Sequence, residues 1–469
     1  MTSNMDSTTN TQQSTETKAA LPGGATRAIG RWAASITNSS LPSHVAHHGR
    51  RMIVDYLAAS VAGSTNPLSQ RLREFLAENE PGTRATAIRG ASMTASAAAY
   101  TNGVAAHGLE LDDGYTPGSV HPGAAVIPAV LAVAEATRAS IDDAARAVAV
   151  AVEVTSRIAA AGHPAVLNAG FHNTGVTGVF GAAAGVVNLL GGNEQQYCDA
   201  LGLAGSHAGA LREYHTAASE VKRLHAGKAA RDGVMCGEMA MAGISGPDTV
   251  LEGPNGYFSA FARGDWNPDV LLGGLGEDWV CTRTYIKPYP CCRHLHGPID
   301  AALALRETGQ FDIDDVESVE VSTFEIATRL RRAPASTLLE AQFSIPFAVA
   351  AALRLGSVTL DSFRPECIAD ARVQQLAARV TIDADANATA AYPHERPATV
   401  TVTARDGRTF AHHVSQPLGE PGNPIDDDAL SAKFESLVFP IMGESLGSQM
   451  LNAAWRGNDI TEITAALGA

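Results

Sequence analysis

The segment RRMIVDYLAASVAG at residues 50–63 decides the class of fold to which this chain belongs. Its Met, Ile, Val, Leu and Ala residues recur at helical spacing, and charged residues are sparse. Segments 123–137, 141–161 and 176–190 have the same texture. Because these segments are apolar almost all round, each helix is expected to be buried on several faces. The sequence therefore predicts one large helical domain with small contact residues.

The texture changes after about residue 280. VESVEVSTF (316–324), ARVTIDADA (378–386) and ATVTVTARDGRTFAHHV (398–414) alternate β-branched and polar residues, a pattern typical of strands. The last segment carries Asp-Gly between its two arms, which predicts a hairpin. Helical stretches at 298–306 and 342–355 lie between the strands. This region is predicted to be an α+β domain.

The chain is thus expected to be mainly α with an α+β second domain. Residues 25–280 and 418–469 are predicted to form a discontinuous helical domain, and residues 281–417 an inserted α+β lid. Residues 1–24 are rich in Ser, Thr, Asn and Gln and contain one Lys. They lack the apolar core of a signal peptide and the arginines of a transit peptide, so a disordered tail is expected.

Composition and charge exclude several classes of protein. With 45% hydrophobic and 18% charged residues, the 469-residue chain is of the globular type. Its formal charge of −15 argues against nucleic acid or an anionic membrane surface as a partner. The apolar stretch 123–134 contains a proline and is followed by Glu135, so no membrane span is expected. Six cysteines without a CxxC pair predict free thiols in a reducing, cytoplasmic location.

Lysine is the most informative residue type, because the chain has only five. Lys222 and Lys228 lie in SEVKRLHAGKAARDG (219–233), and Lys287 lies in TYIKPYPCCRHLHG (284–297). Two short cationic segments in an acidic protein indicate a binding site for a small polyanion. The alternative is that each segment is a solvated helix terminus whose positive charges lie near the negative, C-terminal end of a helix dipole.

A second candidate is the loop AAHGLELDDGYTPGSVHPGAAV (105–126), which contains His107, Glu110, Asp112, Asp113 and His121. Carboxylates and imidazoles in one loop between apolar helices suit proton transfer. The alternatives are helix capping by Asp113 or a metal site on His107 and Glu110. Because no further ligand set follows, we predict that the chain binds no metal.

A third segment, NAGFHNTGVTGVFGAAAG (168–185), places His172 before a glycine-rich helix start. The free N–H groups of such a start favour an anion. The alternative is a cap followed by small residues for close helix packing. The glycines do not form GxGxxG after a strand, so no dinucleotide site is predicted.

Taken in order, HGLELDDGYTPGSVHPG, GFHNTGVTGVFGAA, KRLHAGKAARDG and KPYPCCRHLHG resemble the MmgE/PrpD family over about residues 30–420. That family includes 2-methylcitrate dehydratase, cis-aconitate decarboxylase, iminodisuccinate epimerase and alkylcitrate dehydratase-like enzymes. The resemblance implies a cofactor-independent enzyme with a large helical domain and a smaller α+β lid, which forms a homodimer.

The resemblance also implies active-site roles for individual residues: His121 in the His-Pro step, His172 after Gly-Phe, Lys222 before Arg-Leu-His and Lys287 before Pro-Tyr-Pro. Two positions depart from the family pattern. Glu110 stands where many members have aspartate. Gly114 stands where threonine often follows the Asp-Asp pair. These departures bear on the identity of the substrate.

We therefore expect a lyase that acts on a citrate- or aconitate-type tricarboxylate without metal or cofactor. The Glu-Leu-Asp-Asp run and the Cys-Cys-x-x-x-His-Gly-Pro run at 291–298 favour cis-aconitate-type decarboxylation. A 2-methylcitrate or 2-alkylcitrate dehydratase is the alternative, and an iminodisuccinate-type epimerase a further one. The predicted catalytic residues are His121, His172 and Lys222, and the predicted substrate-binding residues are Glu110, Asp113, Lys287, Arg293 and His296.

Overall fold

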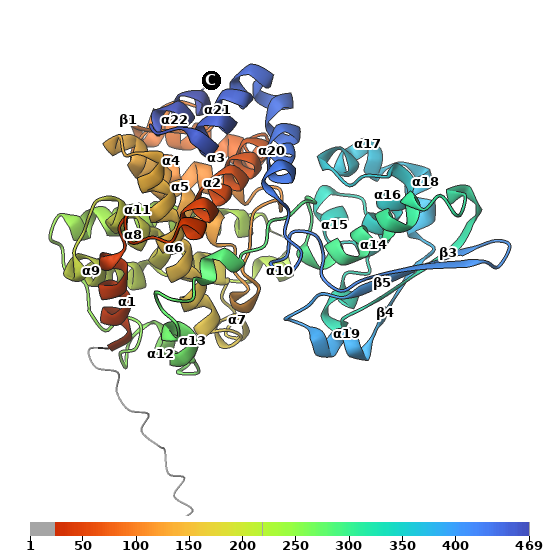
Figure 1. The fold of residues 1–469 in the computed structure, drawn as a ribbon, viewed down its shortest axis with the longest axis horizontal. Coiled ribbons are helices and arrows are strands. Elements are labelled where there is room, and N and C mark those ends of the chain that lie inside the picture. Colours follow the sequence, from red (N-terminus) through yellow and green to blue (C-terminus); the bar gives the residue numbers. More distant parts are fainter. Residues whose placement is uncertain (1–23, 218, 469) are drawn as a thin grey trace, which may run out of the picture.

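The computed structural model describes residues 24–217 and 219–468, which form two lobes of unequal size (Figure 1). The larger lobe is helical. The smaller lobe contains a four-stranded sheet and helices. The predicted fold class, mainly α with an α+β second domain, is confirmed.

The larger lobe is built almost entirely of helices, and four of them contain the apolar segments that predicted this class. Residues 50–63 lie in α2 and residues 141–161 form α6. The helices of this lobe that precede the smaller lobe are α1 (Gly24–Ser35), α2 (Ser43–Gly63), α3 (Pro67–Asn79), α4 (Ala95–Ala106), α5 (Pro122–Thr137), α6 (Ile141–Ala161), α7 (Ala165–Asn168), α8 (Asn173–Leu189), α9 (Glu194–His207), α10 (Tyr214–Ala217), α11 (Val221–Met241), α12 (Tyr257–Phe261) and α13 (Pro268–Leu272), with short 3₁₀ turns at Thr116–Gly118 and Val280–Arg283.

Glycine and alanine allow the central helices to pack closely. Helix α11 packs against α4, α5 and α8, and α8 also packs against α6. An added Cβ at Gly227 would lie 2.2 Å from the carbonyl oxygen of Tyr100, and one at Gly181 would lie 1.8 Å from Oγ1 of Thr155. Larger side chains would force these helices apart. The ends of α4, α5, α8 and α11 are thereby fixed relative to one another.

The larger lobe also contains one small element that the sequence pattern did not predict. Strands β1 (Pro81–Thr86) and β2 (Ser92–Met93) form an antiparallel pair. Their residues are mostly small or polar and only partly buried, so the alternation that identifies a strand is weak.

The smaller lobe contains the predicted strands and the predicted hairpin. Its sheet has the order β4-β3-β5-β6, with β3 and β4 parallel and the other neighbours antiparallel. Helices α14 and α16 pack on the sheet (Figure 1). The elements are α14 (His296–Glu307), β3 (Val316–Thr323), α15 (Leu338–Gln342), α16 (Ile345–Leu355), α17 (Pro365–Ile368), α18 (Ala371–Ala377), β4 (Val380–Ala384), α19 (Ala386–Ala391), β5 (Ala398–Ala404) and β6 (Thr409–Val414), with 3₁₀ turns at Arg293–Leu295, Ile313–Asp315, Glu325–Arg329 and Leu360–Phe363.

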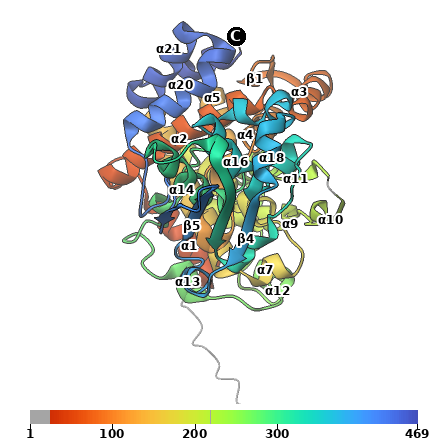
Figure 2. The ribbon, with the colours of Figure 1, turned by 90° about the vertical axis from the view of Figure 1, so that its right-hand side faces the viewer.

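The last helices return to the larger lobe, on which they pack in both ribbon views (Figures 1 and 2). They are α20 (Asp427–Met442), α21 (Glu444–Arg456) and α22 (Thr461–Leu467). One hydrophobic core contains residues from 25–286 and 425–467, and the other contains residues from 291–402. These two cores divide between residues 286 and 291 and between residues 402 and 425, and the predicted boundaries at 281 and 418 stay proposals. Of the predicted tail, residues 1–23 lie outside the described part, whereas Gly24 begins α1.

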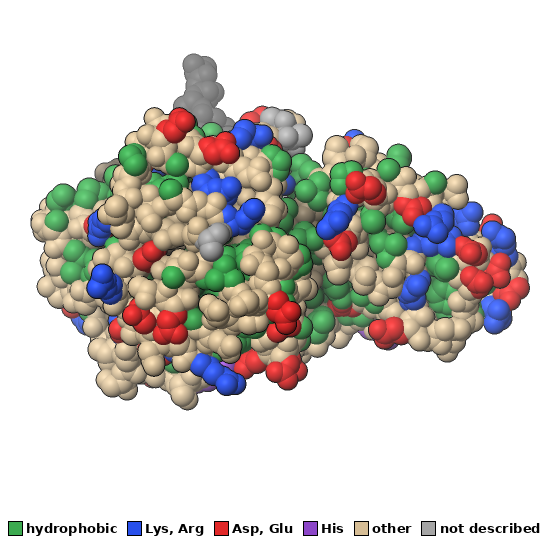
Figure 3. Space-filling view, turned by 90° about the horizontal axis from the view of Figure 1, so that it is seen from above, with side chains coloured by type: hydrophobic (Ala, Val, Ile, Leu, Met, Phe, Trp, Pro, Cys, Tyr) green, Lys and Arg blue, Asp and Glu red, His purple; other side chains and the backbone are tan. Residues whose placement is uncertain are grey.

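The surface carries charges of both signs. Figure 3 shows basic and acidic side chains gathered together at the outer end of the smaller lobe. Among the helices described, none is long and apolar enough to cross a membrane.

Candidate active site

The candidate site lies where four mutually packed helices end. His107 follows the last turn of α4, His121 precedes α5, and His172 precedes α8. Lys222 lies in the first turn of α11. The positive ends of α5 and α8 favour anions and uncharged imidazoles over cations. Three motifs that together span more than 100 residues of sequence are thus brought to one place.

Two lysines meet at Glu110. Lys222 Nζ donates a hydrogen bond to Oε1 of Glu110, and Lys287 Nζ lies 3.6 Å from Oε2. Lys287 Nζ also lies 3.7 Å from Oδ1 of Asp112. Burial by itself would lower the pKa of Lys287, but Asp112 and Glu110 raise it above its ordinary value. Its ammonium group is 1% exposed and makes no hydrogen bond to any described residue, so its three donors are available to a ligand.

The backbone at Glu110 is held from both sides. Its φ of +57° lies in the left-handed region, which is unfavourable for a residue with a Cβ. Gln342 of the smaller lobe donates to the carbonyl oxygen of Leu109 at 2.9 Å. Lys433 of α20 donates to the carbonyl oxygen of Leu111 at 3.0 Å. The smaller lobe and α20 therefore both fix the conformation that directs Glu110 toward the lysines.

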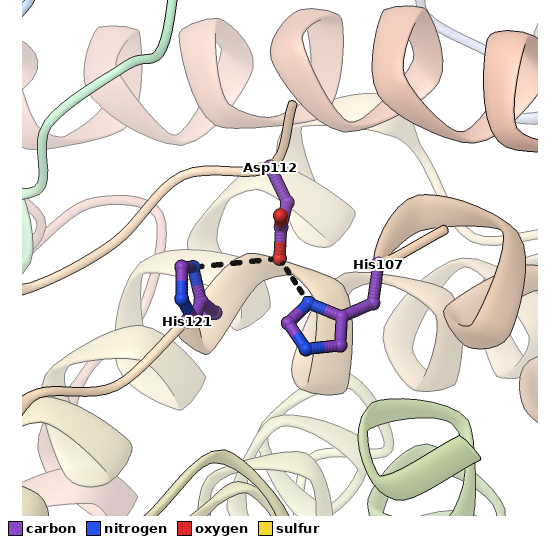
Figure 4. A group of neighbouring side chains, drawn as sticks. All are labelled: His107, Asp112 and His121. Carbon is purple, nitrogen blue, oxygen red and sulfur yellow. Dashed lines mark hydrogen bonds and ion pairs between the residues drawn. The ribbon is translucent and has the colours of Figure 1, made fainter. Parts of the chain in front are cut away.

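Asp112 lies between two imidazoles (Figure 4). Its Oδ2 is 2.6 Å from Nδ1 of His107 and 3.5 Å from Nδ1 of His121. Nδ1 of His121 is also 2.7 Å from the backbone carbonyl oxygen of Asp113. A carbonyl oxygen only accepts hydrogen bonds, so Nδ1 of His121 carries the hydrogen. When His121 is uncharged, its Nε2 is therefore the nitrogen that can accept a proton.

His172 faces a second group of rings. Its Nδ1 lies 3.1 Å from Nδ1 of His225, and its ring stacks on that of His107 with centroids 5.9 Å apart. Burial, followed by the nearby His107 and Lys222, holds the pKa of His172 well below its ordinary value. Burial likewise lowers the pKa of His121 to about 3. At neutral pH, and without an anionic ligand, both imidazoles are uncharged.

The two carboxyl groups of the site are ionised. Burial by itself would raise the pKa of Glu110, but Lys222 and Lys287 hold it below its ordinary value. Burial by itself would also raise the pKa of Asp112. The nearby His107, His121 and Lys287 together hold that pKa well below the usual range. The charges of two lysines and two carboxylates thus balance one another in the site.

His107, Asp112 and His121 form the group that most resembles a metal site, because one ligand atom of each lies within 4.8 Å of the others. However, the 2.6 Å separation of His107 and Asp112 is that of a hydrogen bond and places a proton where an ion would bind. Lys287 lies 3.7 Å from the same carboxylate and would repel a cation. The geometry fits a proton relay better than a metal centre.

Three residues predicted to contact substrate, namely Asp113, Arg293 and His296, also have partners within the protein, and their contact with substrate stays a prediction. Asp113 accepts the N–H of Gly123 at 2.9 Å, as the capping alternative anticipated. Arg293 donates to Glu420 at 2.9 Å, and its Nη1 lies 2.8 Å from Nδ1 of His296. Local sequence did not reveal these partners, because Glu420 is 127 residues from Arg293.

The contact between the lobes includes residues that the motifs did not identify. Glu420 also accepts from Arg396 at 2.7 Å, and Arg396 donates to Thr116 in the site loop at 2.8 Å.

The Tyr285 ring fills the space beside Gly114, where an added Cβ would lie 2.2 Å from the phenol oxygen. A larger side chain at position 114 would therefore collide with Tyr285. The scarcity of lysine was the one sequence signal that pointed to Lys433.

A cavity of about 760 Å³ adjoins the site. His225 and Tyr214 belong to its wall, and both rings also contact the ring of His172. The rest of the lining is largely apolar and includes Phe171, Leu211 and Phe261. The proposed proton-transfer residue His172 therefore lies directly behind a cavity wall.

Buried histidines predict how stability depends on pH. Burial lowers the pKa of seven of them, so between about pH 6.5 and 4.5 the unfolded chain binds protons that the folded chain does not. Four buried carboxyl groups have raised pKa values and oppose this effect. Because these histidines outnumber the carboxyl groups, unfolding should take up protons near pH 5, and the melting temperature should fall from pH 7 to pH 5. Calorimetry across this range checks the result, and a constant melting temperature would contradict it. The histidines are His48, His121, His163, His172, His225, His294 and His296, and the carboxyl groups are those of Asp55, Asp113, Glu153 and Asp300.

Comparisons with known proteins cover nearly the whole chain. The model of the MmgE/PrpD N-terminal domain matches residues 27–269, and that of the MmgE/PrpD C-terminal domain matches residues 289–456. A cis-aconitate decarboxylase of Mus musculus is 27% identical over 90% of this chain and 88% of its own length. The Homo sapiens protein of that name is 28% identical over 84% of each chain. The Aspergillus terreus protein of that name is 27% identical over 97% of each.

Proposed function

The chain belongs to the MmgE/PrpD family and is a lyase, and from that premise we propose that it removes carbon dioxide from a cis-aconitate-type tricarboxylate. The single observation that carries the proposal is the meeting of Lys222 and Lys287 at Glu110, next to two uncharged imidazoles. Buried ammonium groups bind carboxylates strongly because little water screens them. The names of the relatives, which match over most of their length, support the choice of reaction.

The reaction requires one carbon–carbon bond to break and one carbon to be protonated. As the bond to the departing carboxylate breaks, its electron pair forms a new carbon–carbon double bond. The electron pair of the original double bond then takes a proton at its far carbon, so that carbon dioxide and an unsaturated dicarboxylate result. Lys222 and Lys287 would hold the remaining carboxylates, and His121 or His172 would deliver the proton.

The proton donor would form only when substrate is bound. His121 is uncharged in the unliganded site because burial lowers its pKa to about 3. A polyanion beside it favours the charged imidazole and raises that pKa toward neutrality. Substrate binding and formation of the acid are thereby linked.

Glu110 would have to yield the lysines to the substrate. Because its carboxylate accepts a hydrogen bond from Lys222 and lies near Lys287, Glu110→Gln should free Lys222 and remove from the pocket a negative charge that repels the substrate. We expect the dissociation constant of propane-1,2,3-tricarboxylate, a saturated analogue, to fall about tenfold, or about 1.4 kcal/mol. Titration calorimetry measures this. The matched control is Glu78→Gln on the exposed face of α3, which should change nothing. Weaker binding to Glu110→Gln would show that Glu110 contacts the substrate favourably.

The experiment that tests the function is proton NMR of the products formed from cis-aconitate, citrate, 2-methylcitrate, longer 2-alkylcitrates and iminodisuccinate. We expect loss of carbon dioxide from cis-aconitate, with one deuterium incorporated from heavy water. Dehydration of a citrate would instead identify a hydro-lyase, and exchange at one carbon without net conversion would identify an epimerase. We also propose that the protein is a cytoplasmic homodimer, which light scattering and cell fractionation test.

Activity is expected without any metal or nucleotide. Lys287 and the hydrogen bond between His107 and Asp112 occupy the place where an ion would lie. Turnover should therefore survive exhaustive dialysis against a chelator. Loss of activity that a divalent ion restores would contradict this expectation.

A further inference from the structure

His107 contacts both imidazoles to which the proposed function gives proton-transfer roles. Its ring centroid lies 5.1 Å from that of His121 and 5.9 Å from that of His172. The side chain is 0% exposed. His107 therefore touches the reacting histidines from the protein side, and nothing in the proposed reaction uses it.

Asp112 anchors the His107 ring. The ionised carboxylate only accepts hydrogen bonds, so Nδ1 of His107, 2.6 Å from Oδ2, is the donor. The other oxygen, Oδ1, faces Lys287 at 3.7 Å and has no hydrogen-bond partner among the described residues. The pair is buried, where a charge-assisted hydrogen bond is strong and its loss is costly.

The same carboxylate acts on His121. Oδ2 of Asp112 lies 3.5 Å from Nδ1 of His121, and the carbonyl oxygen of Asp113 lies 2.7 Å from that nitrogen. Both oxygens favour the tautomer with hydrogen on Nδ1, which leaves Nε2 for the substrate. The backbone N–H of His121 donates to Oγ1 of Thr174 at 3.1 Å and thereby fixes the start of α5. If the His107 ring were absent, Asp112 would be free to turn toward Lys287.

We infer that His107 is a positioning residue that, through Asp112, holds His121 in the tautomer and orientation needed for proton transfer. The inference rests on the proposed role of His121, but it concerns a hydrogen-bond arrangement that exists without substrate. Groups that orient a catalytic imidazole in this way commonly change turnover more than binding.

The charged groups that face His121 predict a change in its titration. They are Asp112 and His107 from its own loop, Lys222 from α11 and Lys287 from the segment before the smaller lobe. Of these, Asp112 is the one that favours the protonated ring. If Asp112 turns away in His107→Leu, His121 should become harder to protonate, and the alkaline limb of the pH–rate profile, where the proton donor is lost, should move to lower pH.

The first test needs no substrate. In nitrogen-15 NMR of the full-length wild-type protein, His121 should show hydrogen on Nδ1 and a bare Nε2. In His107→Leu the Asp113 carbonyl is left to hold the tautomer without Asp112, so a fraction of the other tautomer should appear, and His107→Asn, which keeps a donor near the Nδ1 position, should restore the wild-type pattern. The opposite tautomer in the wild-type protein would overturn the inference, as would an unchanged pattern in His107→Leu.

The second test is kinetic and uses whichever tricarboxylate the wild-type enzyme converts. We expect His107→Leu to lower kcat by about 10–100-fold with KM within about twofold, and His107→Asn to recover most of the loss. The control is His163→Leu, at a half-buried histidine on the turn after α6, which should leave kcat unchanged. A near-normal kcat for His107→Leu overturns the inference.

Metal binding and a failure of His107→Leu to fold would also bear on the positioning role of His107. If wild-type protein binds one divalent ion per chain and His107→Leu loses it, His107 is a metal ligand and the inference is wrong. If His107→Leu does not fold, the tautomer of the wild-type protein and the kinetics of His107→Asn and Asp112→Asn decide instead, and Asp112→Asn should reproduce the loss of kcat. Failure of the proposed decarboxylation would leave the NMR result unaffected, so the two failures are distinguishable.

Discussion

His121→Ala is expected to lower turnover by ~10²–10⁴-fold, the usual contribution of a general acid or base. The imidazole carries hydrogen on Nδ1 and leaves Nε2 for the substrate, because Nδ1 faces the Asp113 carbonyl at 2.7 Å. Alanine removes that group without removing either lysine. Binding of propane-1,2,3-tricarboxylate should therefore change little, and kcat, inhibitor affinity and melting temperature together test the role.

A folded His121→Ala protein that turns over at a near-normal rate would contradict this role. The proton-transfer function would then pass to His172, whose ring faces the same site from the start of α8. His172→Ala provides the matched comparison, because both histidines precede helices and both are uncharged at neutral pH.

Lys222→Ala is expected to cost 2–4 kcal/mol in kcat/KM, on the order of a buried charge partner of a carboxylate. Its ammonium group contacts Glu110 in the unliganded site and would pair with substrate once Glu110 yields. A small alkylamine in solution should restore part of the activity by occupying the vacated space. Steady-state kinetics with and without ethylamine measure both effects.

The control for Lys222 lies on the same helix. Lys228 pairs with Asp232 one turn further along α11 and donates to the carbonyl oxygen of His207. Lys228→Ala should therefore leave kcat/KM within about twofold, apart from any loss of stability. Equal losses for the two variants would show that α11 needs positive charge in general and would contradict a specific role for Lys222.

A double variant separates binding of substrate from neutralisation of Glu110. Lys222→Ala leaves Glu110 with Lys287 as its remaining ion-pair partner among the described residues. If the loss of activity in Lys222→Ala comes partly from the Glu110 carboxylate left without that partner, Lys222→Ala/Glu110→Gln should be more active than Lys222→Ala alone. Additive effects of the two substitutions on the activation free energy would show that Glu110 and Lys222 act independently.

The local pattern of the sequence predicted most of the secondary structure. Residues 141–161 form one helix because their apolar side chains recur at a period of 3.6 and can be buried on several sides. Residues 398–414 form two paired strands because their alternation has a period of two and Asp-Gly suits the turn. Periodicity of this kind is encoded by neighbours in the chain, so one sequence suffices to detect it.

The motifs also predicted which residue types the site would contain. Rare lysines, paired acidic residues and histidines near glycine or proline indicated a polyanion and proton transfer before any contact was known. Lys222 and Glu110 were both identified in this way, although 112 residues separate them. The resemblance of four ordered motifs then restricted the chemistry to one family.

Only the tertiary structure decided which of these residues are partners. Arg293 was predicted to bind substrate, and the structure adds Glu420 as its partner, because the chain returns from the smaller lobe beside it. Gln342 and Lys433 lie outside every motif, yet they hold the carbonyl groups on either side of Glu110. Partner choice depends on distance and burial in space, and a hydrogen bond or ion pair acts over a few ångströms whatever the separation in sequence. The sequence by itself therefore determined the elements and the chemical inventory of the site, whereas packing of the two lobes determined which charges are paired and which, like that of Lys287, have donors left for a ligand.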